Sequence, residues 1–158
     1  MNYRHLFRGK RLDNGEWVQG HYRSRTMEPN FDRVRHFISM DYPEIYEIDE
    51  TTLGQCTGLK DKNGRLIFEG DIVSISNEVQ QWRNGVAIPY IGEVIWHRDG
   101  FWVNTRPGMG FNEMPQGTLL ELFDCCEWYG HFDEIEKPIN RLVYAGNVHD
   151  NPELLGEG

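Results

Sequence analysis

The 158-residue chain carries 16 Lys and Arg against 25 Asp and Glu, a net charge of −9 at neutral pH. Hydrophobic residues make up 39% and aromatic residues 13% of the sequence, a content that excludes an intrinsically disordered chain. The acidic balance argues against a general binder of nucleic acids or anionic membranes, because phosphate contacts require Lys and Arg. No run approaches the ~20 apolar residues of a membrane-spanning helix.

Strand-like runs separated by turn signals follow one another along the chain. We expect strands at residues 17–22, 66–68, 71–76, 92–97, 101–104 and 141–146, several of which alternate apolar and polar residues. Four dipeptides predict tight type I′ hairpin turns: Asn14-Gly15, Asn63-Gly64, Asn84-Gly85 and Asp99-Gly100. The sequence therefore predicts a mostly β protein with few short helices, one of them a single turn at Pro152–Leu155.

The chain divides in composition near residue 53, which predicts an N-terminal β subdomain over residues 1–53 and a second domain over residues 54–158. A long loop is expected at residues 105–117, where Gly and Pro are frequent and no periodicity appears. Three Cys, two of them adjacent at Cys125 and Cys126, do not indicate a disulfide framework. No apolar signal segment opens the sequence, so we expect a cytoplasmic location.

Charge is distributed unevenly. Residues 1–35 carry eight basic residues against four acidic ones, whereas residues 36–158 carry eight basic against 21 acidic ones. Between Arg106 and Lys137 there are seven acids and no Lys or Arg. Such a division is typical either of two solvated faces or of a basic surface that meets an acidic surface on a neighbouring subunit.

Three segments, residues 7–20, 54–73 and 146–155, resemble the YopX family of small proteins, found mainly in phages and prophages of bacteria. The longest contains Thr57-Gly58-Leu59-Lys60-Asp61-Lys62-Asn63-Gly64. Cys56 departs from the pattern, which has an aromatic residue there. The resemblance implies a small SH3-like β-barrel in the C-terminal two-thirds, after an N-terminal β-hairpin subdomain, in a protein of the bacterial host cytoplasm. It implies no activity, because the family has no agreed biochemical function.

The signature residues have a structural interpretation, since Gly permits unusual backbone conformations and Asp and Asn bind backbone amides. This structural motif comprises Gly54, Gly58, Asn63, Gly64, Gly70, Asp71, Gly146, Asn147 and Pro152.

No pattern of residues predicts a catalytic centre, a metal site or a cofactor. The residue types that ligate metals occur at His97, Asp99, Cys125, Cys126, His131 and Asp133, but without the paired spacing of structural zinc sites. Cys56, Cys125 and Cys126 lack the surroundings of a known nucleophile motif. Acidic pairs such as Glu134 and Glu136 are expected in any acid-rich chain. The favoured interpretation is therefore a protein without enzymatic activity, and the open alternative is an enzyme such as a hydrolase, whose His and carboxylate groups would converge only in the fold.

Protein binding is the leading interpretation. Five Trp and seven Tyr exceed what a small core needs, and aromatic residues favour interfaces, although we expect two of Trp17, Trp96 and Trp102 to fill the core. We predict a homo-oligomer that also contacts a host or phage protein. The candidate partner-binding residues are Trp82, Arg83, Met109, Phe111 and Met114.

The alternative is a nucleic-acid-binding β-barrel that uses the basic N-terminal third. Cations beside aromatic residues can follow a phosphate backbone and stack on bases. The candidate nucleic-acid-binding residues are Arg8, Lys10, Arg11, Arg23 and Arg25.

Overall fold

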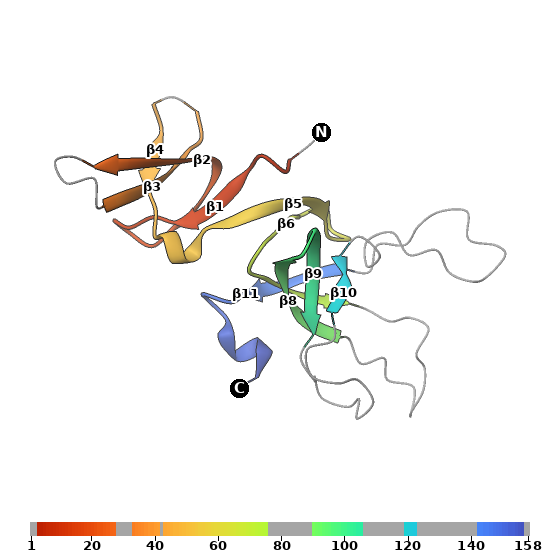
Figure 1. Cartoon of the computed structure of the whole chain (residues 1–158). Coiled ribbons are helices and arrows are strands. Elements are labelled where there is room, and N and C mark those ends of the chain that lie inside the picture. Colours follow the sequence, from red (N-terminus) through yellow and green to blue (C-terminus); the bar gives the residue numbers. More distant parts are fainter. Residues whose placement is uncertain are drawn as a thin grey trace, which may run out of the picture. The chain divides into compact units, whose positions relative to one another are not determined.

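A computed structural model of the chain describes residues 3–27, 33–41, 43–75, 90–105, 119–122 and 142–156. These residues form two compact units, residues 1–58 (unit 1) and 59–158 (unit 2), drawn in Figure 1. The two units divide between residues 58 and 59, and the domain boundary between residues 53 and 54 stays a prediction.

Unit 1 is built on an antiparallel sheet with the strand order β4-β3-β2-β1-β5. Its elements are β1 (Phe7–Lys10), β2 (Trp17–Met27), β3 (Arg33–Ser39), β4 (Ile45–Glu47), the 3₁₀ turn η1 (Glu50–Thr52) and β5 (Gly54–Lys60). The strand β6 (Leu66–Phe68) follows β5 in the sheet order. Buried Ile38, Ile48 and Cys56 belong to the core on which these strands pack.

Unit 2 contains a second antiparallel sheet, with the order β10-β9-β8-β7-β11. Its elements are β7 (Asp71–Ile75), β8 (Tyr90–His97), β9 (Gly100–Thr105), β10 (Leu119–Glu121), β11 (Leu142–Asn147) and the 3₁₀ turn η2 (Pro152–Leu155). The prediction of a mostly β protein is therefore confirmed. Closing a barrel requires the two edge strands to pair, and within the described residues β10 and β11 remain edges. The SH3-like barrel stays a prediction.

Aliphatic side chains fill the core of unit 2. It consists of Ile67, Val73, Ile75, Val94, Val103, Leu122 and Leu142. The prediction that two of three tryptophans fill a core was wrong: Trp17 and Trp102 are half-buried, and Trp96 is 52% exposed. Trp96 lies near the end of the β8–β9 hairpin, where it packs edge-on against Phe101 at 4.9 Å between ring centroids. None of the described helical turns is long and apolar enough to cross a membrane.

The hairpin turns differ from the predicted type. A type I′ turn needs positive φ at both central residues, yet at Asn63-Gly64 only the glycine has it (φ +84°). Asp61 N–H donates to the Arg65 carbonyl and Gly64 N–H to the Asp61 carbonyl, which makes a three-residue loop that ends in a bulge. Asn14-Gly15 likewise has positive φ at the glycine alone. The predicted type I′ turn was wrong at both sites, because the prediction considered the dipeptide alone and not the residues that flank it.

The β8–β9 turn begins one residue earlier than predicted. Gly100 pairs with His97, so Arg98 and Asp99 are the central residues, and Arg98 takes the positive φ of +56°. The fourth dipeptide, Asn84-Gly85, lies outside the described residues.

A buried carboxylate organises the β5–β6 hairpin. One oxygen of Asp61 accepts backbone N–H groups from Asn63 and Arg65 at 2.9 Å, and the other accepts that of Tyr144 in β11 at 3.2 Å. Burial raises the pKa of Asp61, but the hydrogen bonds from Arg65, Tyr144 and Asn63 together outweigh it and leave the pKa below its ordinary value. Asp61 therefore links the loop between β5 and β6 to the strand β11, which is distant in sequence.

A second buried carboxylate fixes the entrance of β7. Asp71, with no exposed surface, accepts the Phe68 N–H at 2.8 Å, and the Asn147 side chain donates to the Gly70 carbonyl at 2.7 Å. Gly70 has a φ of +79°, which a side chain would strain. A Cβ at Gly146 would lie 2.7 Å from the Asn151 Oδ1, so the close approach of η2 requires glycine there.

We expect the substitution D61N to lower the free energy of unfolding by about 1–3 kcal/mol, because an amide offers one acceptor oxygen to three N–H donors. Thermal unfolding followed by circular dichroism measures the loss. D99N, the same chemical change at an exposed turn residue, is the matched control and should leave stability unchanged.

The same variant should alter the response to acid. Since the folded-state pKa of Asp61 lies below the unfolded value of about 4, its contribution is complete above that pH and is lost as pH falls through the folded pKa. D61N should therefore lose less stability than the parent between neutral pH and about pH 3. Equal losses in the two proteins would contradict this role.

Candidate anion-binding surface

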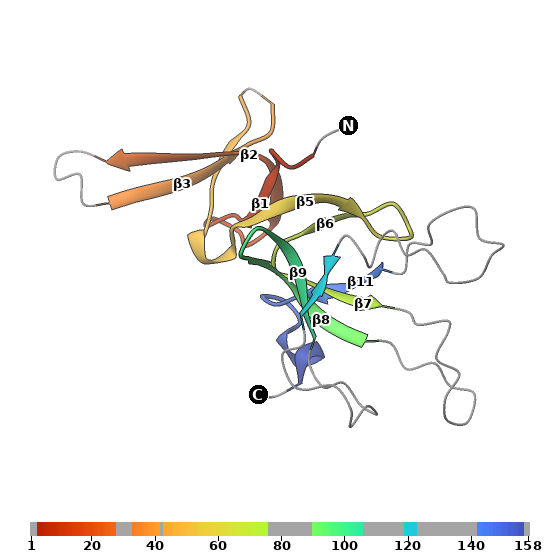
Figure 2. The ribbon, with the colours of Figure 1, turned by 45° about the vertical axis from the view of Figure 1, so that its right-hand side comes forward.

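Four arginines share one face of the long β2–β3 ribbon, which Figure 2 shows as two strands running side by side. The antiparallel register places Arg23 opposite Phe37, Arg25 opposite Arg35 and Met27 opposite Arg33. Because alternate residues of a strand point to the same side, these side chains all belong to one surface. We call Arg23, Arg25, Arg33 and Arg35 the arginine face.

One acidic residue in the neighbouring strand partly neutralises this surface. Glu47 of β4 lies opposite Phe37 and forms a two-pronged ion pair with Arg35. Hydrogen bonding to Arg35 lowers the pKa of Glu47 despite opposing desolvation, so this carboxylate is charged at neutral pH. The Arg35 guanidinium also lies 5.6 Å from the Phe37 ring centre. Among the described residues, Arg23, Arg25 and Arg33 contact no acidic side chain.

The pairing of Arg25 with Arg35 costs stability. Like charges directly opposite each other in an antiparallel pair are destabilising, and both residues lie on the solvent-exposed part of the ribbon. The connecting residues 28–32, which include Glu28 and Asp32, lie outside the described part of the chain. A concentrated positive surface on paired strands is the arrangement expected of a site that receives an anionic group from outside.

The structure separates the five predicted nucleic-acid-binding residues into two groups. Arg23 and Arg25 belong to the arginine face. Arg8 is buried, with its guanidinium 4.9 Å from the Trp17 ring centre, and the Lys10 ammonium lies 5.4 Å from the same ring. These two cations contact the aromatic side chain of the adjacent strand β2.

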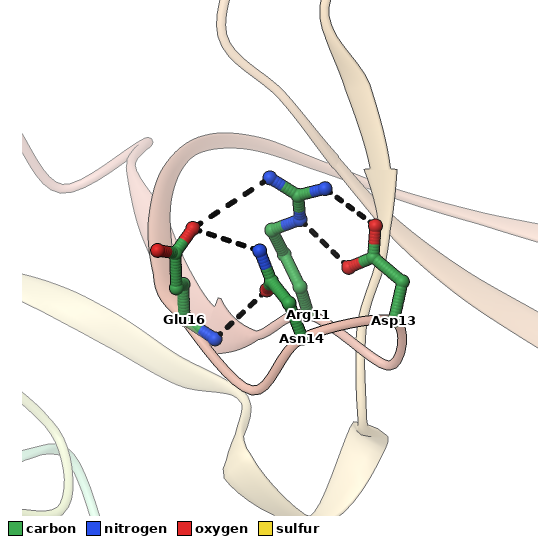
Figure 3. Close-up of polar contacts among 4 residues, drawn as sticks. All are labelled: Arg11, Asp13, Asn14 and Glu16. Carbon is green, nitrogen blue, oxygen red and sulfur yellow. Dashed lines mark hydrogen bonds and ion pairs between the residues drawn. The ribbon is translucent and has the colours of Figure 1, made fainter.

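Arg11 is occupied within its own turn, as Figure 3 shows. Its guanidinium donates to Asp13 at 2.8 Å and lies 3.9 Å from Glu16, while Asn14 links to Glu16 through two hydrogen bonds. The hydrogen bond with Asp13 raises the pKa of Arg11 and lowers that of Asp13. Arg11 therefore orders the β1–β2 turn, and an external phosphate would have to displace two carboxylates.

The opposite face of the ribbon carries a hydrogen-bonded array. The Tyr22 hydroxyl lies 2.7 Å from His36 Nδ1, and His36 Nε2 lies 2.8 Å from Glu50. Such an order of groups is found in acid–base relays. Both ring nitrogens of His36 are already occupied, however, so the imidazole has no position left to activate a further nucleophile. The array instead ties η1 to the ribbon.

Several predicted residues fall elsewhere. All five candidate partner-binding residues, Trp82, Arg83, Met109, Phe111 and Met114, lie outside the described residues, as do Cys125, Cys126, His131 and Asp133. Cys56 has no exposed surface, which removes it as a nucleophile in this state. Across the described ranges, no group of three or more His, Cys, Asp or Glu side chains is placed to hold a metal ion.

The structural-motif residues occupy turns, strand ends and a bulge. Gly54 pairs with Arg8 at the start of β5, and Pro152 opens η2. Gly58 and Gly64 have positive φ, and Gly146 follows an irregularity in the pairing of β11 with β7. Asn147 is buried beside Asp71.

Arg33 and Arg35 belong to the basic N-terminal third on which the nucleic-acid interpretation rests, but they were not among its five candidate residues. A usable signal was present: Arg23-x-Arg25 and Arg33-x-Arg35 each repeat with the two-residue period of a strand. Each pair therefore lies on one side of its strand. That both pairs share one face depends on the register, which the sequence alone does not specify.

The profile of the YopX protein family matches residues 6–156, nearly the whole chain. The chain belongs to the YopX family. A solved structure, protein EF1440 from Enterococcus faecalis, is similar to this YopX protein at 22% identity over 94% of this chain and 96% of that one, with a TM-score of 0.47. No curated protein matches the sequence.

Removing the repulsion between Arg25 and Arg35 tests the register of β2 and β3 in this YopX protein. R25T should stabilise the ribbon by about 0.5 kcal/mol, since a like-charge pair is replaced by a β-favouring residue. Amide hydrogen exchange in β2 and β3 should slow by about twofold. R23T, opposite Phe37 rather than a cation, is the control, and an equal effect in R23T would show that charge repulsion is not the cause.

Proposed function

We propose that this YopX protein is a non-enzymatic binding module that associates with a second copy of itself through the arginine face. The observation that carries the proposal is the direct opposition of Arg25 and Arg35, with Arg23 and Arg33 on the same surface. Four cations, with one acidic neighbour among the described residues, form a surface whose repulsion an anionic partner would relieve.

The chain itself supplies suitable anionic groups. Residues 36–158 carry 21 acidic residues against eight basic ones, including seven acids and no Lys or Arg between Arg106 and Lys137. A basic surface in one copy and an acidic segment in another make a complementary pair, which steers association and fixes its specificity. We further propose, from the family resemblance, that the protein acts as a phage or prophage accessory protein in the bacterial cytoplasm and there contacts a host or phage protein.

Removing charge from the arginine face should weaken self-association. We expect R23Q/R25Q/R33Q to weaken association by about 10- to 100-fold, as three exposed ion pairs are lost. Size-exclusion chromatography with light scattering measures the mass at about 50 mM and about 500 mM salt, between which screening increases sharply. The parent should be oligomeric at the lower salt and should dissociate at the higher one.

The control variant is K60Q/K62Q/R98Q, which changes the net charge equally at exposed positions of unit 2. It should associate as the parent does. A parent protein that is monomeric at both salt concentrations would exclude this function.

A second candidate function is nucleic-acid binding, favoured by the shape of the site. A two-stranded β-ribbon fits the major groove of DNA, and arginines on its outer face would reach phosphates or guanine edges. The acidic remainder of the chain opposes this function. Titration of the same two triple variants with double- and single-stranded DNA distinguishes it: a true site would show a salt slope that falls by about 2 to 3 in R23Q/R25Q/R33Q.

A further inference from the structure

Among the described residues, one edge of the strand β3 is paired over only part of its length. All seven residues of β3 pair with β2, but β4 pairs only with Phe37–Ser39. Ile48 adds one hydrogen bond, from its N–H to the His36 carbonyl at 2.9 Å. The next residue, Asp49, donates instead to the Lys10 carbonyl of β1. The chain thus leaves the edge of β3 before it reaches Val34.

The direction of the backbone groups at Val34 follows from this pattern. Successive residues of a strand direct their N–H and C=O groups to opposite sides. Since the His36 carbonyl faces the β4 side, Val34, two residues earlier, presents both its N–H and its C=O on that side. No described strand lies opposite Val34 there. An unpaired N–H and C=O on a strand edge form a template for another strand.

A cavity of about 630 Å³ lies along this edge. Its lining includes Val34, Ile48 and Leu12, and the side chains of Val34 and Leu12 are 52% and 60% exposed. A small unit gains by burying such apolar groups. The cavity therefore combines a hydrogen-bonding edge with apolar surface, the two features that strand addition uses.

The charges of the lining indicate which strand fits. Arg35 forms an ion pair with Glu47, His36 Nε2 lies 2.8 Å from a Glu50 oxygen, and Asp49 accepts the Thr51 N–H. Arg33 also lines the cavity and contacts no acidic side chain among the described residues. In an antiparallel strand centred on Val34, the residues on either side of the central one would lie opposite Arg33 and Arg35. A carboxylate opposite Arg33 would be attracted to its guanidinium, and one opposite Arg35 would share that guanidinium with Glu47.

A second copy of β3 does not meet this requirement. Antiparallel pairing of two such edges about Val34 would place Arg33 of each copy opposite Arg35 of the other. Like charges directly opposite are destabilising, so the two arginines act against edge-to-edge pairing of this strand with itself. This edge of β3 therefore favours a segment that does not carry positive charge at these two positions.

We propose that the edge of β3 at Val34 binds an extended segment of a partner protein by antiparallel strand addition, and that this segment has the pattern acidic–apolar–acidic. The apolar residue lies opposite Val34 and exchanges two backbone hydrogen bonds with it. The acidic residues lie opposite Arg33 and Arg35. This inference goes beyond the proposed function, because it depends on the strand edge rather than on the outward surface of Arg23 and Arg25.

The test uses the full chain and a fluorescein-labelled peptide, Ser-Thr-Glu-Val-Glu-Thr-Ser, with blocked ends. Fluorescence anisotropy should show saturable binding, and the Val34 amide should exchange with solvent at least about tenfold more slowly in the saturated complex. Replacing both Glu by Lys in the peptide should abolish binding. Methylation of the central backbone nitrogen should weaken binding about tenfold, because it removes one hydrogen bond and blocks the other sterically.

Two protein variants locate the site. V34P removes the outward N–H and should lose binding at least tenfold, whereas V34T keeps the N–H and should bind as the parent does. R33Q should weaken binding about threefold to tenfold, and R23Q, on the same face but distant from the edge, should have no effect. Amide exchange of β2 verifies that each variant is folded.

Three results would overturn the inference: no binding of the acidic peptide, equal binding of the N-methylated peptide, or equal binding by V34P and V34T. The N-methylated peptide keeps the test decisive if V34P does not fold. Self-association through the arginine face is measured separately, since V34P leaves Arg23, Arg25 and Arg33 in place. The failure of either proposal is therefore visible without the other.

Discussion

The register between β2 and β3 is the constraint on which the surface chemistry of unit 1 depends. Pairing Arg25 with Arg35 places two arginines of each strand on one side and the Tyr22–His36–Glu50 array on the other. A shift of one residue would turn every side chain of one strand to the opposite face. Of these two registers, the buried Ile38, opposite Tyr22, selects the observed one, because its side chain must point into the core. Burial on one face thus dictates the concentration of charge on the other.

Unit 2 depends on a different device, the buried carboxylate that binds backbone amides. Asp61 and Asp71 each stand at a change of chain direction and hold backbone or side-chain donors from segments far away in sequence. Loops cannot satisfy their own polar groups through sheet ladders, so carboxylate oxygens accept those hydrogen bonds instead. This explains why the family signature is rich in Asp, Asn and Gly.

Much of the fold was predictable from local sequence. Alternation in β7 and β8 and the turn residues between strands identified a mostly β protein, and the three signature segments identified the family. The turn type at Asn63-Gly64 was not predictable from the dipeptide, because the Asp61 carboxylate selects a longer loop. The tryptophans were misassigned because hydrophobicity alone does not tell a core position from a hairpin end, where Trp96 lies.

The candidate site was predictable only in part. Basic residues cluster in the first 35 positions, but sequence proximity does not separate Arg11, which its own turn neutralises, from Arg23 and Arg25, which the ribbon exposes. Arg33 and Arg35 join them through strand pairing, a long-range property. The edge at Val34, which no described strand covers, depends on where β4 ends and the chain turns to β1, and the sequence shows no pattern that predicts this turn.

Because Cys56 is buried, the rate at which its thiol is alkylated measures how often unit 1 opens. Its backbone N–H is bonded to the Leu6 carbonyl and its side chain has no exposed surface, so a thiol reagent reaches the sulfur only when this part of the fold opens. With Cys125 and Cys126 replaced by Ser, the chain would retain a single reactive sulfur. The rate of its alkylation would then report how often β5 detaches from its neighbours, at one position and without any added label.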